Sequence, residues 1–219
     1  MKAMTTQTTW GHVTSETVKR ALCIDFEGQK DKPPVLLGCA TRRGRASSPP
    51  AWQYITDPTF EPLAQVGDME LLTLSAAVER ILHRAEKRDR QIIAWSEHEL
   101  NVVKAYCPEH LERFESRYVN ARTYAVYWRN KCHGTDKPGT ATLASYLALI
   151  GHAVPIGAGP GDVGKTIGLV RKSLEKGFGV NGLTDNQRRR WELLREHNRH
   201  DCVGMRKVCT VAAAEIAAH

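Results

Sequence analysis

ALCIDFEG, residues 21–28, alternates between apolar and polar side chains as a half-buried β-strand does. Leu22, Ile24 and Phe26 fall on one face of this strand. Asp25 and Glu27 are two residues apart, so both carboxylates point to the other face. Two carboxylates crowded on an otherwise apolar strand cost free energy unless cations balance them or water reaches them. The stretch therefore predicts either a cation site or the wet face of an edge strand.

The chain on either side of this strand predicts an α/β fold. GQKDKPP is a turn, VLLGCATR a second strand that pairs antiparallel with the first, and WQYITDP a short third strand. Strands and helices then alternate, which suits one mixed sheet of five strands, three antiparallel and then parallel, with helices on both faces. The expected later elements are a helix over 69–88, a strand over 91–96, a helix over 97–107, a strand within 118–124, a helix over 141–152, a helix ending near 176, and a helix from Thr184 at least to Val208.

Composition and length bound the domain organisation. We expect a loose N-terminal arm over residues 1–18 and a single domain over 19–219, since the chain has no internal repeat or evident linker. The six cysteines form no C-x2-C pair, which disfavours a structural zinc site. The chain has no run of eighteen apolar residues and no apolar secretory leader at its start, so we expect no membrane partner and a cytoplasmic location.

The formal net charge of +7 predicts a basic surface, which suits either simple solubility or a polyanionic partner such as nucleic acid. Basic residues cluster twice, and such clusters are usually solvated helix faces. One group lies within residues 80–90 and the other within residues 188–199. The second group is the more interesting because it precedes another acidic residue, Asp201, and we expect Arg199 to contact substrate.

Two further acids make the cation interpretation of the first strand stronger. Glu99 follows the strand QIIAWS at the start of a helix, and Asp201 lies on the long last helix. On that helix His197 precedes Asp201 by four residues, so the two share a face. Four acids converging at one end of a sheet suit two Mg²⁺ or Mn²⁺ ions, which together catalyse phosphodiester hydrolysis. An imidazole such as that of His197 is a suitable general base because it titrates near neutral pH.

The runs CIDFEG, WSEHE and HNRHDC, in this order, resemble the three motifs of the DEDD (DnaQ-like) exonuclease superfamily. Within it the chain is similar to the ribonuclease-H-like exonuclease branch, over nearly its whole length. The resemblance implies a ribonuclease-H-like fold, two divalent metal ions, and removal of nucleotides from the 3′ end of a nucleic acid. By position, Asp25 and Glu27 match the first motif, Glu99 the second acid and Asp201 the last. It also implies that Glu27 helps to hold the 3′-terminal nucleotide.

The chain departs from the superfamily pattern at two points. The second acid is usually Asp, whereas here the candidates are Glu99 and, as the less favoured alternative, Glu97. The superfamily places either Tyr with three intervening residues before the last acid or His with four. This chain has His197 with three intervening residues, so a histidine stands where the pattern has tyrosine. His200, beside Asp201, is expected on another side of the helix and at the surface.

The loop GPGDVGKT, residues 159–166, satisfies the phosphate-loop pattern G-x4-G-K-T. That pattern needs a buried strand before the loop, and IGHAVPIGA is too short and is interrupted by Pro155. A nucleotide-hydrolysing loop is therefore disfavoured, and a plain connection is the simplest interpretation. A milder role remains, in which Lys165 touches a substrate phosphate.

The sequence thus predicts a metal-dependent 3′–5′ exonuclease acting on DNA or RNA, with a single-stranded 3′ end as its partner. Two alternatives stay open: a structure-selective endonuclease with the same fold, and a binding module that is non-catalytic or activated by a partner. The sequence names no protein partner and does not distinguish DNA from RNA, because that choice depends on side-chain geometry around the 2′-hydroxyl.

Overall fold

The computed structural model describes residues 13–41, 51–134, 141–153 and 163–219. The described strands are β1 (Leu22–Glu27), β2 (Leu36–Ala40), β3 (Ala51–Ile55), β4 (Glu70–Leu71), β5 (Ile92–Ala94) and β6 (Tyr118–Asn120). The described α-helices are α1 (Ser15–Arg20), α2 (Glu61–Val66), α3 (Leu74–Glu86), α4 (His98–Tyr106), α5 (Leu111–Glu115), α6 (Ala121–Cys132), α7 (Leu143–Leu149), α8 (Val163–Leu174) and α9 (Asp185–Ala218). Short 3-10 turns occur at η2 (Pro58–Phe60), η3 (Pro108–His110) and η4 (Gly179–Gly182).

The described strands form one mixed sheet in the order β4-β3-β2-β1-β5-β6. β1, β2 and β3 are the expected antiparallel meander, and β5 and β6 continue the sheet in parallel with β1. Because β1, β5 and β6 run the same way, their carboxyl ends meet at one edge of the sheet. β1 lies at the centre of the sheet, so its two acids are not on an edge strand.

The sheet has six strands in the described residues where we expected five. The additional strand, β4, pairs in parallel with β3 through Tyr54 and Ile55. We expected a helix from residue 69, but the side chain of Thr73 accepts a hydrogen bond from the backbone N–H of Ala76 and starts α3 there. The residues before this cap are therefore free to extend along the sheet.

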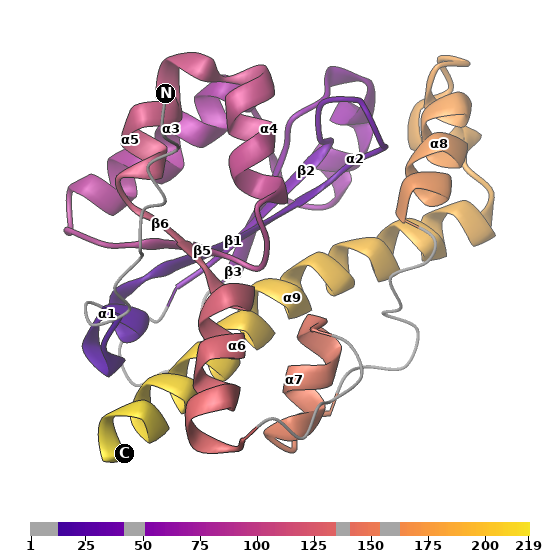
Figure 1. The fold of residues 1–219 in the computed structure, drawn as a ribbon. Helices are drawn as coiled ribbons and strands as arrows, with labels where there is room; N and C mark the ends of the chain where they lie inside the picture. Colours follow the sequence, from indigo (N-terminus) through magenta and orange to yellow (C-terminus); the bar gives the residue numbers. More distant parts are fainter. Residues whose placement is uncertain (1–12, 42–50, 135–140, 154–162) are drawn as a thin grey trace.

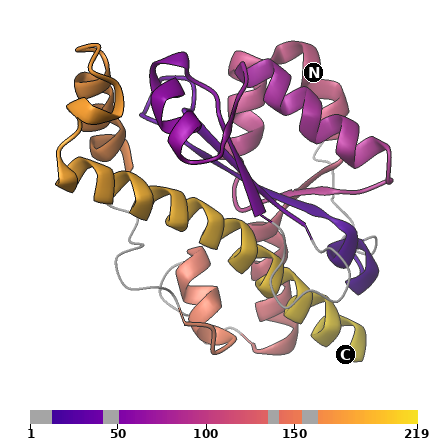
Figure 2. The ribbon, with the colours of Figure 1, turned by 180° about the vertical axis from the view of Figure 1, so that it is seen from behind.

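Helices cover both faces of the sheet (Figures 1 and 2). On one face Leu22, Ile24 and Phe26 pack against α3, α4 and α5 in one apolar cluster. On the other face Cys23 and Ile93 pack against α1, α6, α7 and α9 in a second cluster. β1 is therefore buried on both sides, as expected for a central strand. In the part of the chain that the structure describes, no helix is long and apolar enough to cross a bilayer.

Four described helices were absent from the expected element order, namely α1, the short α2 and α5, and α6. Residues 15–20 form α1 where we expected a loose arm up to residue 18, because Val13 and Val18 are buried against α9 and α6 and the Tyr124 hydroxyl donates to the Val13 carbonyl. Beyond β6, residues 121–132 form α6, which we did not predict. Its start is fixed by Asn120, whose side chain accepts from the N–H of Thr123.

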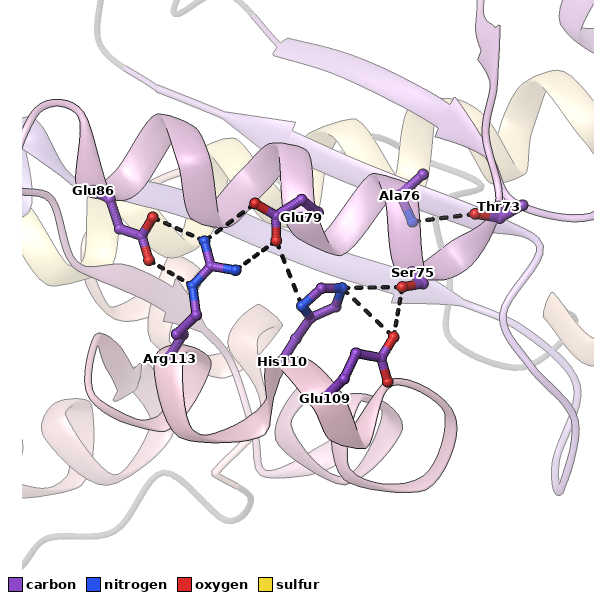
Figure 3. Close-up of polar contacts among 8 residues, drawn as sticks. All are labelled: Thr73, Ser75, Ala76, Glu79, Glu86, Glu109, His110 and Arg113. Atoms are coloured by element: carbon purple, nitrogen blue, oxygen red, sulfur yellow. Dashed lines mark hydrogen bonds and ion pairs between the residues drawn. The ribbon is translucent and has the colours of Figure 1, made fainter.

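An ion-pair network holds α5 and η3 against α3 (Figure 3). The Arg113 guanidinium donates to both carboxylates of α3 that face it, Glu79 (Nη1–Oε2 2.6 Å) and Glu86 (Nε–Oε1 2.9 Å). His110 lies between the Glu79 carboxylate, 3.5 Å from its Nδ1, and the Ser75 hydroxyl, 3.0 Å from its Nε2. These contacts fix the helices that stand behind β1 and β5, on the face opposite the acids.

α9 is the longest described helix and runs across the whole molecule on the face of the sheet opposite α3, α4 and α5 (Figure 1). It begins where expected, because Thr184 and Gln187 form a capping box in which each side chain bonds to the other's backbone N–H. Its first half packs with α8 and α2 around the buried Trp191, in a third apolar cluster. Its second half packs against α1, α6 and α7.

Candidate functional site

Asp25 and Glu27 lie at the carboxyl end of β1, on the face that α9 covers. Phe26, between them, points to the opposite face and packs with the α3–α5 cluster, as the alternation of the strand predicts. Glu27 is buried, with 8% of its surface exposed. The two acids therefore project from the middle of the sheet toward α9.

Asn198 on α9 fixes the orientation of the Asp25 carboxylate. Its Nδ2 donates to Asp25 Oδ2 at 2.9 Å and to the Asp25 carbonyl at 3.0 Å. Its Oδ1 accepts from Gln53 Nε2 at 3.0 Å. Asn198 is fully buried, and it fits only because Gly38, the β2 partner of Asp25, has no side chain. A Cβ on Gly38 would lie 2.1 Å from Asn198 Oδ1.

Glu99 reaches the same place from the first turn of α4. Its side chain is 3% exposed, and its Oε2 is buried with no hydrogen-bond partner among the described residues. Burial raises the pKa of Glu99 to about 7, although nearby backbone N–H groups, including that of Phe26, favour the ionised form. Glu97, the alternative second acid, is exposed instead. Of the two candidates, the structure brings Glu99 to the other acids.

Asp201 and His197 come from α9, one turn apart. His197 Nε2 lies 3.6 Å from Asp201 Oδ2 and 4.0 Å from Glu27 Oε1. The imidazole is 14% exposed, and its Nδ1 is buried with no hydrogen-bond partner in the described chain. The imidazole therefore stands between Asp201 of α9 and Glu27 of β1. The spacing of four residues predicted its place beside Asp201.

His200 is not the surface residue that we expected. Its ring is 10% exposed, its Nδ1 lies 3.7 Å from Asp201 Oδ1, and it stacks on His152 with ring centroids 5.7 Å apart. The Lys207 ammonium in turn lies 3.2 Å from His152 Nδ1. Burial lowers the pKa of His152, and the nearby Lys207 and His200 lower it further. Asp201 thus has a histidine on each side.

Asp25, Glu27, Glu99 and Asp201 form one group, called the carboxylate cluster below. Desolvation raises the pKa of Asp25 well above its ordinary value, and the three other acids of the cluster raise it further. Desolvation also raises the pKa of Glu27 to about 8, with Asp201 as the next cause. The pKa of Asp201 is raised by burial, against the lowering influence of His197 and His200. The four acids are therefore close enough to repel one another.

No Lys or Arg in the described ranges forms an ion pair with the carboxylate cluster; its only ion-pair partners there are the histidines beside it. Four acids sharing a buried site ionise together only if positive charge is supplied to them. An oxygen-only donor set with one orphaned oxygen, on Glu99, fits hard divalent cations such as Mg²⁺ or Mn²⁺. Within the described residues, no three His, Cys, Asp or Glu side chains already stand at the spacing of a formed metal site.

The two basic residues that we expected to contact substrate are both exposed. Arg199 is exposed on α9 and pairs with Glu196, with Nη2–Oε1 at 2.7 Å. Lys165 is exposed near the start of α8, beside Gln29 and Arg190. The Gly-rich motif that contains Lys165 lies partly outside the described residues, and the described residues before it, 141–153, hold the helix α7 and no strand.

Sequence reasoning missed three residues of this site. Asn198 and His200 stand in the run HNRHDC with His197 and Asp201, and Gln53 lies on β3. The sequence offered one signal for Asn198, its place directly after the candidate His197. In the structure its amide turns toward the sheet, where Gly38 leaves space for it. The histidine stack with His152 joins residues 48 positions apart, and no local pattern marks it.

The chain was compared with protein-family models, curated protein sequences and solved structures, and none of them matches it.

Proposed function

We propose that this protein is a metal-dependent nuclease with a ribonuclease-H-like fold, which removes nucleotides from the 3′ end of a DNA or RNA strand. The observation that carries the proposal is the carboxylate cluster: two buried acids, Glu27 and Glu99, and two partly buried ones, Asp25 and Asp201, meet at the carboxyl edge of the central strands. The order of strands, an antiparallel meander followed by parallel strands, is compatible with the proposed fold.

In this function the four acids of the cluster hold two Mg²⁺ or Mn²⁺ ions. When bound there, the ions supply the positive charge that activates a water molecule and stabilises the leaving oxygen of a phosphodiester. Asn198 keeps the Asp25 carboxylate in one orientation through its two hydrogen bonds. Glu27, at the end of β1, also contacts the 3′-terminal nucleotide.

His197 is the proposed general base, which takes a proton from the attacking water at Nε2. That nitrogen faces the carboxylate cluster, at 3.6 Å from Asp201 and 4.0 Å from Glu27. The neighbouring carboxylates stabilise the imidazolium that forms. After hydrolysis the proton leaves through His197 to solvent, which reaches 14% of the side chain.

The test is cleavage of 5′-labelled single-stranded DNA and RNA in Mg²⁺, Mn²⁺ or EDTA. We expect progressive shortening from the 3′ end, loss of cleavage in EDTA and loss in Asp25→Asn. Asp31→Asn is the matched control, because Asp31 is exposed, six residues along, with φ of 58°, a backbone conformation that Asn also tolerates. It should cleave as the wild type does.

The product pattern separates the alternatives. Internal cuts in a strand with a blocked 3′ end would show that the protein is an endonuclease and not an exonuclease. Tight binding of the strand without cleavage in any metal would show that the protein is a binding module and not a nuclease. Cleavage by Asp25→Asn at the wild-type rate would contradict a catalytic role for the carboxylate cluster.

A further inference from the structure

A basic pocket lies where the turn after β1 meets α8 and α9. Its volume is about 470 Å³, and its lining includes Gln29, Lys165, Gly168, Leu169, Lys172 and Arg190. Three of these side chains are cationic and none of the lining residues is acidic. A concave surface with one sign of charge concentrates ligands of the opposite sign.

The walls of the basic pocket are held in place by the core. Ile167 and Val170 of α8 are fully buried in the cluster that contains Trp191 of α9. Arg171 of α8 forms a 2.7 Å ion pair with Asp57, next to η2. Gln29 lies against α8, since a Cβ on Gly168 would be 3.1 Å from Gln29 Nε2. The cations of the pocket therefore stand on two fixed helices.

Two of these cations have no anionic partner in the structure as described. Lys172 is exposed and Arg190 half-buried, and neither forms an ion pair or hydrogen bond with another described residue. Their neighbours differ: Arg188 pairs with Asp185 and Arg195 with Glu192. The Oε1 of Gln29 is also buried with no partner among the described residues. Lys172 and Arg190 can therefore donate to an anionic ligand, and the Gln29 Oε1 can accept a hydrogen bond from a hydroxyl of that ligand.

The basic pocket is aligned with the carboxylate cluster along α9. Arg190 precedes His197 by seven residues, which is almost two helical turns, so both side chains lie on the same face of α9. At 1.5 Å per residue their separation along the helix is about 10 Å. Gln29 is two residues beyond Glu27. About three nucleotides of a stacked strand, at about 3.4 Å each, span this distance.

We propose that the basic pocket is a phosphate-binding subsite for the sugar–phosphate backbone of a nucleic acid strand, about three nucleotides from the bond that is hydrolysed. The proposal rests on the proposed function for its position, because the strand is the one whose end enters the carboxylate cluster. Lys172 and Arg190 contact phosphate oxygens, and the Gln29 amide hydrogen-bonds to a neighbouring sugar or phosphate. Each phosphate contact releases condensed counterions, so it strengthens binding of any sequence and weakens with salt.

The test is fluorescence anisotropy with a 5′-labelled single strand of twelve thymidines in EDTA, where the metal-dependent reaction is absent. The variant Lys172→Gln/Arg190→Gln removes two cations from the basic pocket. The control Lys19→Gln/Lys87→Gln removes the same charge from exposed positions on α1 and beyond α3, on the side of the molecule away from α8 (Figures 1 and 2).

We expect the pocket variant to bind about 25-fold more weakly at 0.1 M salt, since each lost contact leaves about 0.7 of a counterion unreleased on a single strand. The slope of log affinity against log salt should fall by about 1.4, while the control variant keeps the wild-type slope. Equal slopes for the two variants, or a wild type that binds no strand, would overturn the subsite. So would competition by polyglutamate as strong as that by unlabelled strand.

This result is separable from the proposed function, because anisotropy does not depend on cleavage. Wild-type protein that never cleaves, with affinity lost only in the pocket variant, would refute the nuclease and keep the subsite. Normal cleavage with no difference between the two variants would refute the subsite and keep the nuclease.

Discussion

Asn198 connects α9 to the carboxylate cluster through its hydrogen bonds to Asp25. It is fully buried, spans from α9 to Asp25, and is itself fixed by Gln53. A buried amide with all its partners in place has a single orientation, so the Asp25 oxygen that it does not bond keeps a fixed direction. Metal ligands commonly depend on such supporting hydrogen bonds.

We therefore predict that Asn198→Ala lowers divalent-metal affinity or activity by about 10- to 100-fold. The mechanism is rotation of the Asp25 carboxylate, so the readouts are the Mn²⁺ dissociation constant and the metal concentration that gives half-maximal cleavage. Asn186→Ala, at an exposed position on the first turn of α9, is the control. Equal metal affinity in both variants would show that Asn198 only fills space.

At the scale of elements, the distance between β2 and α9 is set by Gly38. The strand and the helix approach so closely that a Cβ at Gly38 would meet Asn198 Oδ1 at 2.1 Å and Asn198 Cγ at 2.7 Å. Neither element is free to yield, since β2 pairs on both sides and α9 is anchored along its length. A methyl group there overpacks a filled interior.

We predict that Gly38→Ala lowers the free energy of unfolding by about 1–3 kcal/mol. Combining it with Asn198→Ala removes the collision, so the double variant should be less destabilised than the sum of the single variants. Urea unfolding of the four proteins measures this coupling. Strict additivity of the two changes in unfolding free energy would mean that α9 shifts away from the added methyl group, so that the collision with the Asn198 side chain does not determine the cost.

The elements that the sequence predicted are those with strong local signals. The meander of β1, β2 and β3 follows from alternating apolar residues between turns, and the start of α9 follows from its Thr184 cap. The strand β4 has only two residues and exists through its pairing with β3, which no local pattern marks. The helix α6 begins directly after β6, so the strand expected within 118–124 ends early in that range, at Asn120.

For the candidate site, too, the sequence predicts what local spacing determines but not the contacts that tertiary packing determines. A spacing of two on a strand places Asp25 and Glu27 on one face, and a spacing of four on a helix does the same for His197 and Asp201. Glu99 lies near Asp25 because β5, which precedes it, pairs in parallel with β1. The contacts of Asn198 and His200 depend on how α9 is rotated against the sheet, which tertiary packing decides.

At the scale of the whole molecule, the carboxylate cluster opposes folding when it is ionised. Burial and mutual repulsion raise the pKa of Glu27 from 4.5 to about 8 and that of Glu99 from 4.5 to about 7. The folded state therefore holds protons that the unfolded state releases above its pKa near 4.5. The contribution of these two acids to stability is fully present below that pH and is lost as the pH rises toward about 8, at about 1.4 kcal/mol for each pKa unit of a single group.

We predict that metal-free protein becomes easier to unfold as the pH rises from 5 to about 8, the folded-state pKa of Glu27. The measurement is urea unfolding in EDTA at each pH. Glu99→Gln removes one ionising member, so its stability should decline less over this range. A wild type whose stability rises steadily from pH 5 to about 8 would contradict the burial of these acids in solution.

The central claim is that the carboxylate cluster holds two divalent cations, which the nuclease reaction requires. The most direct measurement is titration of the purified protein with Mn²⁺ near pH 8, with free Mn²⁺ followed by electron paramagnetic resonance, for wild type, Asp25→Asn and Asp31→Asn. We predict two bound ions per chain in wild type and Asp31→Asn, with loss of binding in Asp25→Asn. Equal Mn²⁺ binding by all three proteins, or strand cleavage that persists in EDTA, would contradict the claim.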